Sequence, residues 1–150
     1  MHYFSKASLA ALSTCHKDLQ LIANETIKLC PVDFAVTEGH RSHADQLKYF
    51  LEGSSNLDPR VEANLRKAKH LKNPSEAFDF KVVVPGSPSL VYDPEHLTFI
   101  AGFMQAIAAM LKKEGKISHT IRWGGNWNDN GIILRDQQLW DRPHIELLVD

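Results

Sequence analysis

The sequence lacks several features that define other classes of protein. It has only two cysteines, Cys15 and Cys30, and their spacing is neither that of a CxxC motif nor that of a disulfide-rich secreted scaffold. We expect both thiols to be reduced and structural, because nothing near Cys15 and its neighbour His16 supplies the further ligands of a metal site. No run approaches the roughly 20 apolar residues of a membrane helix, and residues 1–20 have no uninterrupted apolar core like that of a signal peptide.

An excess of positive charge is also missing. The 17 lysines and arginines are balanced by 18 aspartates and glutamates, which gives a formal net charge of −1. Because no basic surplus is left to neutralise phosphates, nucleic acid has little support as the main partner, and an anionic membrane has none. We therefore expect a soluble, monomeric protein that is made in the cytoplasm.

The sequence does contain the make-up of one globular domain over residues 1–150, with 43% hydrophobic and 23% charged residues. Apolar residues at helical spacing predict helical structure over much of residues 6–29 and over two further segments, 42–53 and 94–115. Four short segments favour strands: 34–38, 77–84, 120–123 and 145–149. We predict an α+β fold in which helices flank a small, mainly antiparallel sheet.

Eight histidines are spread over the chain, so the surroundings of each must decide whether it binds a metal. His70 lies in a loop that leads to Asp79 as a strand begins, and His144 lies at the start of the last expected strand. Two imidazoles and one carboxylate are a sufficient set for catalytic zinc, which takes three protein ligands and a water molecule. Asp141 stands three residues before His144, where it could take a proton from that water during attack on a carbonyl. Spacing alone also allows ordinary loop-edge histidines and a solvated Asp79.

Four segments resemble the peptidoglycan metallopeptidase family that contains phage L-alanyl-D-glutamate endopeptidases and bacterial D-Ala-D-Ala carboxypeptidases and dipeptidases. They follow the family's order and are Glu38 to Ser42 with Gln46, Lys69 to Asp79, Arg122 to Trp127, and Asp141 to Glu146. The resemblance spans residues 34–147, and the chain looks like a phage endolysin of this family. The six histidines other than His70 and His144 are expected to be structural or solvent-facing.

The resemblance implies a zinc ion bound by His70, Asp79 and His144, at the sheet. It also implies that Asp141 is the catalytic base and that Arg41 contacts the substrate carbonyl. A fixed guanidinium could stabilise the oxyanion that develops during attack, whereas the alternative for Arg41 is a surface ion pair.

The stretch between the metal histidine and aspartate departs from the pattern of many family members. Residues 73–76 make it longer, although a phage-type subgroup shares this form, so we keep Asp79 as the ligand with Glu76 as the alternative. Glu146, two residues after His144 on the same face of a strand, is the competing candidate for the base.

Four residues are expected to bind the substrate: Arg41, Gln46, Trp123 and Trp127. Glycines between the two tryptophans would allow close approach of a substrate backbone, and an indole offers a flat apolar wall. Core packing is an equally good account of Trp123. Residues 126–131 also resemble the start of a calcium loop, although three asparagines replace aspartates and Gln137 replaces the glutamate of the twelfth position. Zinc is therefore the expected cofactor, with calcium as a further candidate.

The preferred interpretation is an endolysin that uses metal-activated water to cut the L-Ala–D-Glu bond of the peptidoglycan stem peptide. Such a lysin would leave the host cytoplasm through a membrane opened by a separate protein and would act in the periplasm or cell wall. The alternative is a D-Ala-D-Ala carboxypeptidase or dipeptidase with the same metal chemistry. A third interpretation is a non-catalytic zinc-binding domain, against which the presence of both Asp141 and Arg41 argues.

Overall fold

The computed structural model describes residues 1–133 and 141–148. The helices are α1 (Lys6–Ser13), α2 (Lys17–Leu29), α3 (His43–Leu51), α4 (Glu62–Lys67) and α5 (Pro94–Lys113), with short 3-10 helices η1 (Lys69–Leu71) and η2 (Pro88–Leu90). The strands are β1 (Phe34–Glu38), β2 (Ala77–Val82), β3 (Thr120–Gly124) and β4 (Asp141–Leu148). They form a four-stranded antiparallel sheet in the order β1-β2-β4-β3. The predicted α+β fold is confirmed.

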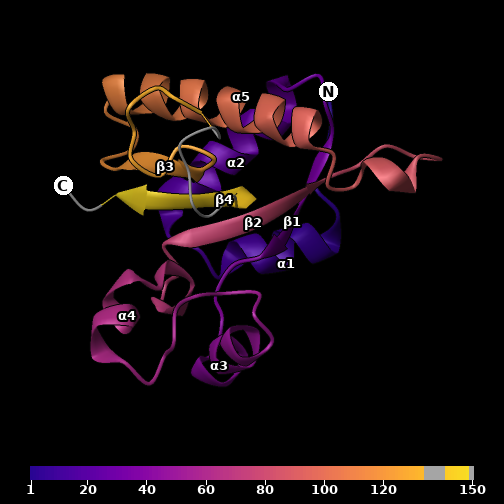
Figure 1. Cartoon of the computed structure of the whole chain (residues 1–150). Coiled ribbons are helices and arrows are strands. Elements are labelled where there is room, and N and C mark those ends of the chain that lie inside the picture. The colour runs from indigo at the N-terminus through magenta and orange to yellow at the C-terminus, as the bar shows by residue number, and fades with distance from the viewer. Residues whose placement is uncertain (134–140, 149–150) are drawn as a thin grey trace.

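The sheet lies between two groups of helices (Figure 1). Helix α5 runs along one side, where it packs on α2 and on strands β2, β3 and β4, while α3 and α4 lie on the opposite side in this view. Phe34, Phe80 and Ile145 project from the strands into the core and are almost fully buried. Ile100 and Met104 meet them from α5 and are fully buried as well. Burial of this apolar surface is the main force that holds α5 on the sheet.

Two helices begin with side-chain caps at or near the starts expected from the ranges 42–53 and 94–115. Ser42 caps α3 by accepting a hydrogen bond from the Asp45 backbone N–H at 3.1 Å. Asp93 caps α5 in the same way through the His96 N–H at 3.1 Å, and Pro94 occupies the first turn, where its missing N–H costs nothing. Helix α5 ends two residues before the Gly115 that was expected to close it.

The helical segment expected over much of residues 6–29 is divided into α1 and α2. Between them, Cys15 forms an isolated bridge with Ser75, and the His16 N–H donates to the Ser75 carbonyl at 2.8 Å. His16 then caps α2 by accepting from the Asp18 N–H at 3.1 Å. A tertiary contact with a distant loop therefore interrupts the helix. The spacing of apolar residues along the sequence does not predict such a contact.

The strand boundaries differ from the expected ones at two places. β2 ends at Val82 instead of residue 84, and β4 begins at Asp141 instead of Ile145. The early start of β4 comes from pairing with β3, in which Gly124 lies opposite Asp141 across a bulge. Residue 149, the expected end of the last strand, lies outside the described residues.

Both cysteines are unpaired and buried, as the sequence predicts. Burial raises the pKa of the Cys30 thiol. None of the helices in the described part of the chain has the length and apolarity needed to span a bilayer.

Candidate active site

Strand pairing brings Asp79 and His144 together. The two residues are partners in the antiparallel register of β2 and β4, and His144 Nδ1 lies 3.0 Å from Asp79 Oδ1. His70 reaches the same oxygen from η1, with its Nε2 3.2 Å from Asp79 Oδ1. The structure therefore places the three predicted ligands in one cluster whose ligand atoms all lie within 4.8 Å of one another.

Each imidazole of this cluster is oriented by a hydrogen bond on its other nitrogen. His70 Nδ1 donates to the Gly39 carbonyl at 2.7 Å, and His144 Nε2 donates to Glu146 Oε1 at 2.9 Å. These bonds leave His70 Nε2 and His144 Nδ1 facing Asp79. Metal-binding histidines are usually held in this way, because the second hydrogen bond fixes both the ring and its tautomer.

The electrostatics of the cluster favour a bound positive charge. Burial by itself would raise the pKa of Asp79, but the charge of His70 and the hydrogen bonds from both histidines hold it well below its usual range. Burial acts to lower the pKa of His144, yet its hydrogen bonds to Asp79 and Glu146 raise that pKa to about 10. Without a metal, the carboxylates therefore hold a proton on His144. The same carboxylates would stabilise a bound cation in place of that proton.

Asp141 stands at the edge of the cluster. It is the first residue of β4, and its Oδ2 lies 3.9 Å from His144 Nδ1. Its side chain is 41% exposed, which leaves the carboxylate open to a water molecule or a substrate. Burial of part of this side chain raises the pKa of Asp141. A carboxylate that is partly desolvated and faces the cavity has the properties of a general base.

Arg41 is held in a fixed orientation on the other side of the cluster. Its Nε and Nη2 donate to the two oxygens of Glu38 at 2.6 and 3.0 Å, and its Nη1 donates to Gln46 Oε1 at 2.8 Å. Nη2 also lies 3.6 Å from Asp79 Oδ2, and the guanidinium stacks over the Tyr49 ring at 4.5 Å. This geometry argues against a mobile ion pair at the surface, because the Arg41 side chain is only 12% exposed.

A cavity of about 580 Å³ joins these groups. Its walls include the cluster of His70, Asp79 and His144, together with both Asp141 and Arg41. A cavity of this size holds a ligand of several residues, and its polar groups converge on one point.

Comparisons with known proteins show the family and the fold of this chain. A family model described as phage L-alanyl-D-glutamate peptidase matches residues 1–148. The chain belongs to this peptidase family. The L-alanyl-D-glutamate peptidase of Escherichia phage T5 is 28% identical over 149 residues, which cover 97% of each chain. The crystal structure of the L-Ala D-Glu endopeptidase ChiX of Serratia marcescens has a similar fold, with a TM-score of 0.69 and 24% identity over 98% of this chain and 91% of that one.

Within this member of the phage L-alanyl-D-glutamate peptidase family, the two tryptophans occupy different surroundings. Trp127 lines the cavity, with its ring 5.5 Å from that of His144. Trp123 is only 2% exposed, and its indole N–H donates to the Arg142 carbonyl at 2.7 Å. The expectation that Trp123 lines the cleft is therefore wrong. Trp123 belongs to the hydrophobic core, where its large apolar surface is buried.

The glycines that follow Trp123 serve the protein's own packing. A Cβ at Gly124 would lie 1.9 Å from the Asp141 carbonyl oxygen, and one at Gly125 would lie 2.3 Å from the Trp123 ring. The close approach that they allow is thus between β3 and β4 and onto the indole, not to a substrate backbone. Gly124 in particular lets Asp141 sit beside β3.

Gln46 is buried and supports Arg41. It is 1% exposed, and besides accepting from Arg41 its Nε2 donates to Ser55 Oγ at 3.0 Å and to the Leu57 carbonyl at 2.9 Å. These bonds tie α3 to the loop that follows it. They fit a positioning role for Gln46 better than direct contact with a substrate.

The two alternative carboxylates have other partners. Glu76, the alternative metal ligand, pairs with Lys69 at 3.2 Å and stands outside the cluster. Glu146, the competing base, is 5% exposed in its side chain and binds both His144 and Arg122, the latter at 2.9 Å. These contacts hold the pKa of Glu146 below its usual value against the effect of burial. Glu146 orients the imidazole of His144.

Two site residues had no expected role in the sequence: Tyr49 stacks on Arg41, and Tyr92 joins the cavity wall from a distant segment. Glu38 belongs to the first family-like segment, but its bonds to Arg41 are seen only in the tertiary structure. In the candidate calcium loop, Asn126 is buried and its Oδ1 has no hydrogen-bond partner within the described residues, whereas Gln137 lies outside them.

Proposed function

We propose that this protein is a zinc-dependent peptidase that hydrolyses the L-Ala–D-Glu bond of peptidoglycan stem peptides. The observation that carries the proposal is the convergence of His70, Asp79, His144, Asp141 and Arg41 on one cavity in a chain that matches the phage L-alanyl-D-glutamate peptidase family. Membership of the family supports the substrate class, and the cluster supports the chemistry.

The geometry of the cluster fits zinc. A tetrahedral zinc ion with bonds of about 2.0–2.1 Å separates its ligand atoms by roughly 3.3 Å. The distances from Asp79 Oδ1 to His70 Nε2 and His144 Nδ1 are 3.2 and 3.0 Å, so small movements would admit the ion. The donor set of two imidazoles and one carboxylate is that of catalytic zinc sites and leaves a position for water. Bound zinc would polarise the scissile carbonyl and lower the pKa of that water.

Asp141 and Arg41 would carry the remaining steps. Asp141 takes a proton from the attacking water on its carboxylate and returns it to the leaving amine, for which the position beside His144 is suited. Arg41 stabilises the negative charge that develops on the carbonyl oxygen, because Glu38 and Gln46 hold its guanidinium in place before the substrate arrives. Trp127 offers an apolar wall for the substrate.

We further propose that the protein acts as a phage endolysin. It would be made in the host cytoplasm and would reach peptidoglycan once a separate protein has permeabilised the membrane. The similarity to the peptidase of Escherichia phage T5 over nearly the whole chain supports this role.

Mass spectrometry of fragments released from purified peptidoglycan tests the proposed activity. The zinc-loaded protein should release fragments with a new N-terminal D-Glu, and Asp141→Asn should release far fewer. Loss of D-Ala alone would show a carboxypeptidase instead. Intact peptidoglycan after incubation with the zinc-loaded protein would mean a binding domain without catalysis.

A further inference from the structure

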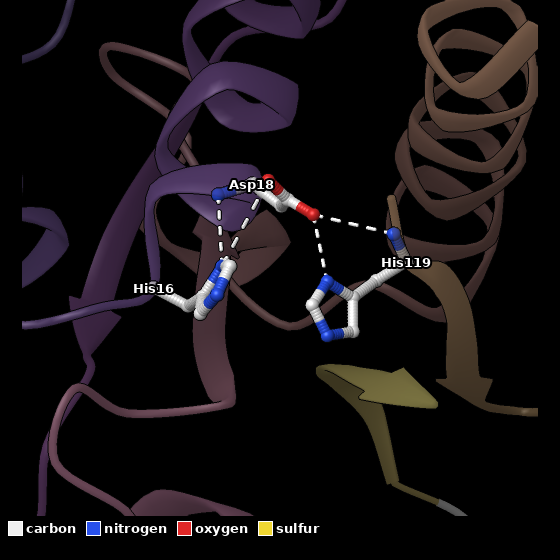
Figure 2. Close-up of side chains that lie close together, drawn as sticks. All are labelled: His16, Asp18 and His119. Carbon is white, nitrogen blue, oxygen red and sulfur yellow. Dashed lines mark hydrogen bonds and ion pairs between the residues drawn. The ribbon is translucent and has the colours of Figure 1, made fainter. Parts of the chain in front are cut away.

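A second cluster of metal-ligating side chains lies outside the cavity. It consists of His16, Asp18 and His119, whose ligand atoms lie within 4.8 Å of one another (Figure 2). His119 Nδ1 lies 2.7 Å from Asp18 Oδ2, and His16 Nδ1 lies 3.9 Å from Asp18 Oδ1. The two imidazole rings are 4.8 Å apart with the carboxylate beside both. None of the three residues lines the candidate active site.

The carboxylate of this cluster is held firmly before any ligand binds. Asp18 is 3% exposed, and its Oδ2 accepts hydrogen bonds from the backbone N–H groups of Ser118 and His119 at 3.1 and 3.2 Å. Backbone donors of this kind fix a carboxylate oxygen and help keep it ionised. The second oxygen is the one that faces His16, so the two oxygens point to different imidazoles.

The imidazoles are suited to complete a metal site. His16 Nδ1 accepts the Asp18 N–H at 3.1 Å, and a metal ion bound to this nitrogen would replace that hydrogen bond. The side chains of His16 and His119 are 23% and 27% exposed. An ion could therefore reach the cluster from solvent and keep water as a further ligand.

We propose that His16, Asp18 and His119 form a second site, for a divalent transition metal ion such as Zn²⁺ or Co²⁺. Two imidazoles and one carboxylate favour such ions over Ca²⁺ and Mg²⁺, which prefer oxygen ligands. The ion would take the place of the proton between His119 and Asp18. The site links the start of α2 to the segment that enters β3, so metal binding should stabilise the fold without taking part in catalysis.

Cobalt titration of the metal-free full-length protein tests this site, because Co²⁺ bound to nitrogen ligands gives a visible absorption spectrum. The parent protein should bind two equivalents. His16→Ala and His119→Ala should each bind one and keep full peptidase activity when loaded with zinc. His96→Ala is the matched control, since His96 also pairs with an aspartate, Asp93, but lies in neither cluster.

A second background keeps this test separate from the proposed peptidase function. The variant His70→Ala/His144→Ala lacks the ligands of the candidate active site and should still bind one equivalent of Co²⁺, with a rise in melting temperature. Adding His119→Ala to it should abolish both effects while the circular dichroism spectrum stays native. If the double variant binds no cobalt, or if cobalt binding survives the added His119→Ala, the three residues form only a hydrogen-bonded clasp and the inference is overturned.

Discussion

Asp79 and His144 face each other across β2 and β4, and this register makes one carboxylate oxygen of Asp79 the common neighbour of two imidazoles. His144 Nδ1 lies 3.0 Å and His70 Nε2 lies 3.2 Å from that oxygen. A shift of one residue in the register would turn the Asp79 side chain to the other face of the sheet. The cluster therefore depends on the core residues that fix the pairing of these strands.

The first prediction concerns the metal. A chelator should abolish activity, and added Zn²⁺ should restore it, because the attacking water depends on the ion. His144→Ala removes a ligand, so zinc content and activity should fall together; Glu76→Ala removes a carboxylate outside the cluster and should change neither. Elemental analysis and turnover measured on the same samples decide this. An undiminished zinc content in His144→Ala would point to other ligands.

The second prediction separates chemistry from metal binding at Asp141. Asp141→Ala should retain zinc and fold, while kcat falls at least about a hundredfold, since a general base typically contributes 10²–10⁴-fold. KM should change much less.

Glu146→Gln is the matched comparison for Asp141→Ala. Glu146 accepts the Nε2 hydrogen of His144 and also pairs with Arg122, so its amide variant should weaken zinc affinity before it lowers the turnover of the zinc-loaded enzyme. Near-normal turnover of zinc-loaded Asp141→Ala, with collapse of Glu146→Gln, would exchange the two roles.

The third prediction concerns Arg41 and its support. Arg41→Ala should keep zinc yet lose about a hundredfold or more in kcat, as removal of a fixed oxyanion partner does in other hydrolases. Gln46→Ala leaves the guanidinium in place but releases one of its bonds, so its loss of rate should be smaller. Steady-state kinetics on both variants test this order. A larger loss in Gln46→Ala at unchanged stability would mean that Gln46 contacts the substrate itself.

The fourth prediction compares two glycines. A Cβ at Gly124 would lie 1.9 Å from the Asp141 carbonyl oxygen, so Gly124→Ala must move β3 away from β4. We expect a loss of about 1–3 kcal/mol in the free energy of unfolding, as in other overpacked sites, and a fall in kcat through displacement of Asp141.

Gly102 provides the control for this substitution. It lies within α5, and a Cβ there meets nothing within 4 Å. Gly102→Ala should therefore raise the free energy of unfolding by roughly 0.5–1 kcal/mol through helix propensity and leave activity unchanged. Urea denaturation followed by circular dichroism measures both variants, and equal stabilities would contradict the contact at Gly124.

The sequence by itself determined the elements whose signals are local. Apolar spacing predicted α3 and α5, and short segments that favour strands predicted the sheet and hence the α+β class. The resemblance of the segments around His70 and His144 to a peptidase family implied which side chains would gather. These features depend on interactions within a few residues of one another or on a motif that spans them.

Only the tertiary structure decided features that depend on contacts between distant segments. The contact of Ser75 with Cys15 interrupts the first helical segment. Trp123, which was expected to bind the substrate, is buried in the core. Nothing in the sequence near Cys15 and His16 supplied further ligands, yet His119 reaches Asp18, beside His16, from 101 residues away in the sequence. The places of these residues depend on how α2, α5 and β3 pack together. Burial of apolar surface drives this packing and is not directional, so the local sequence does not reveal which distant residues will meet.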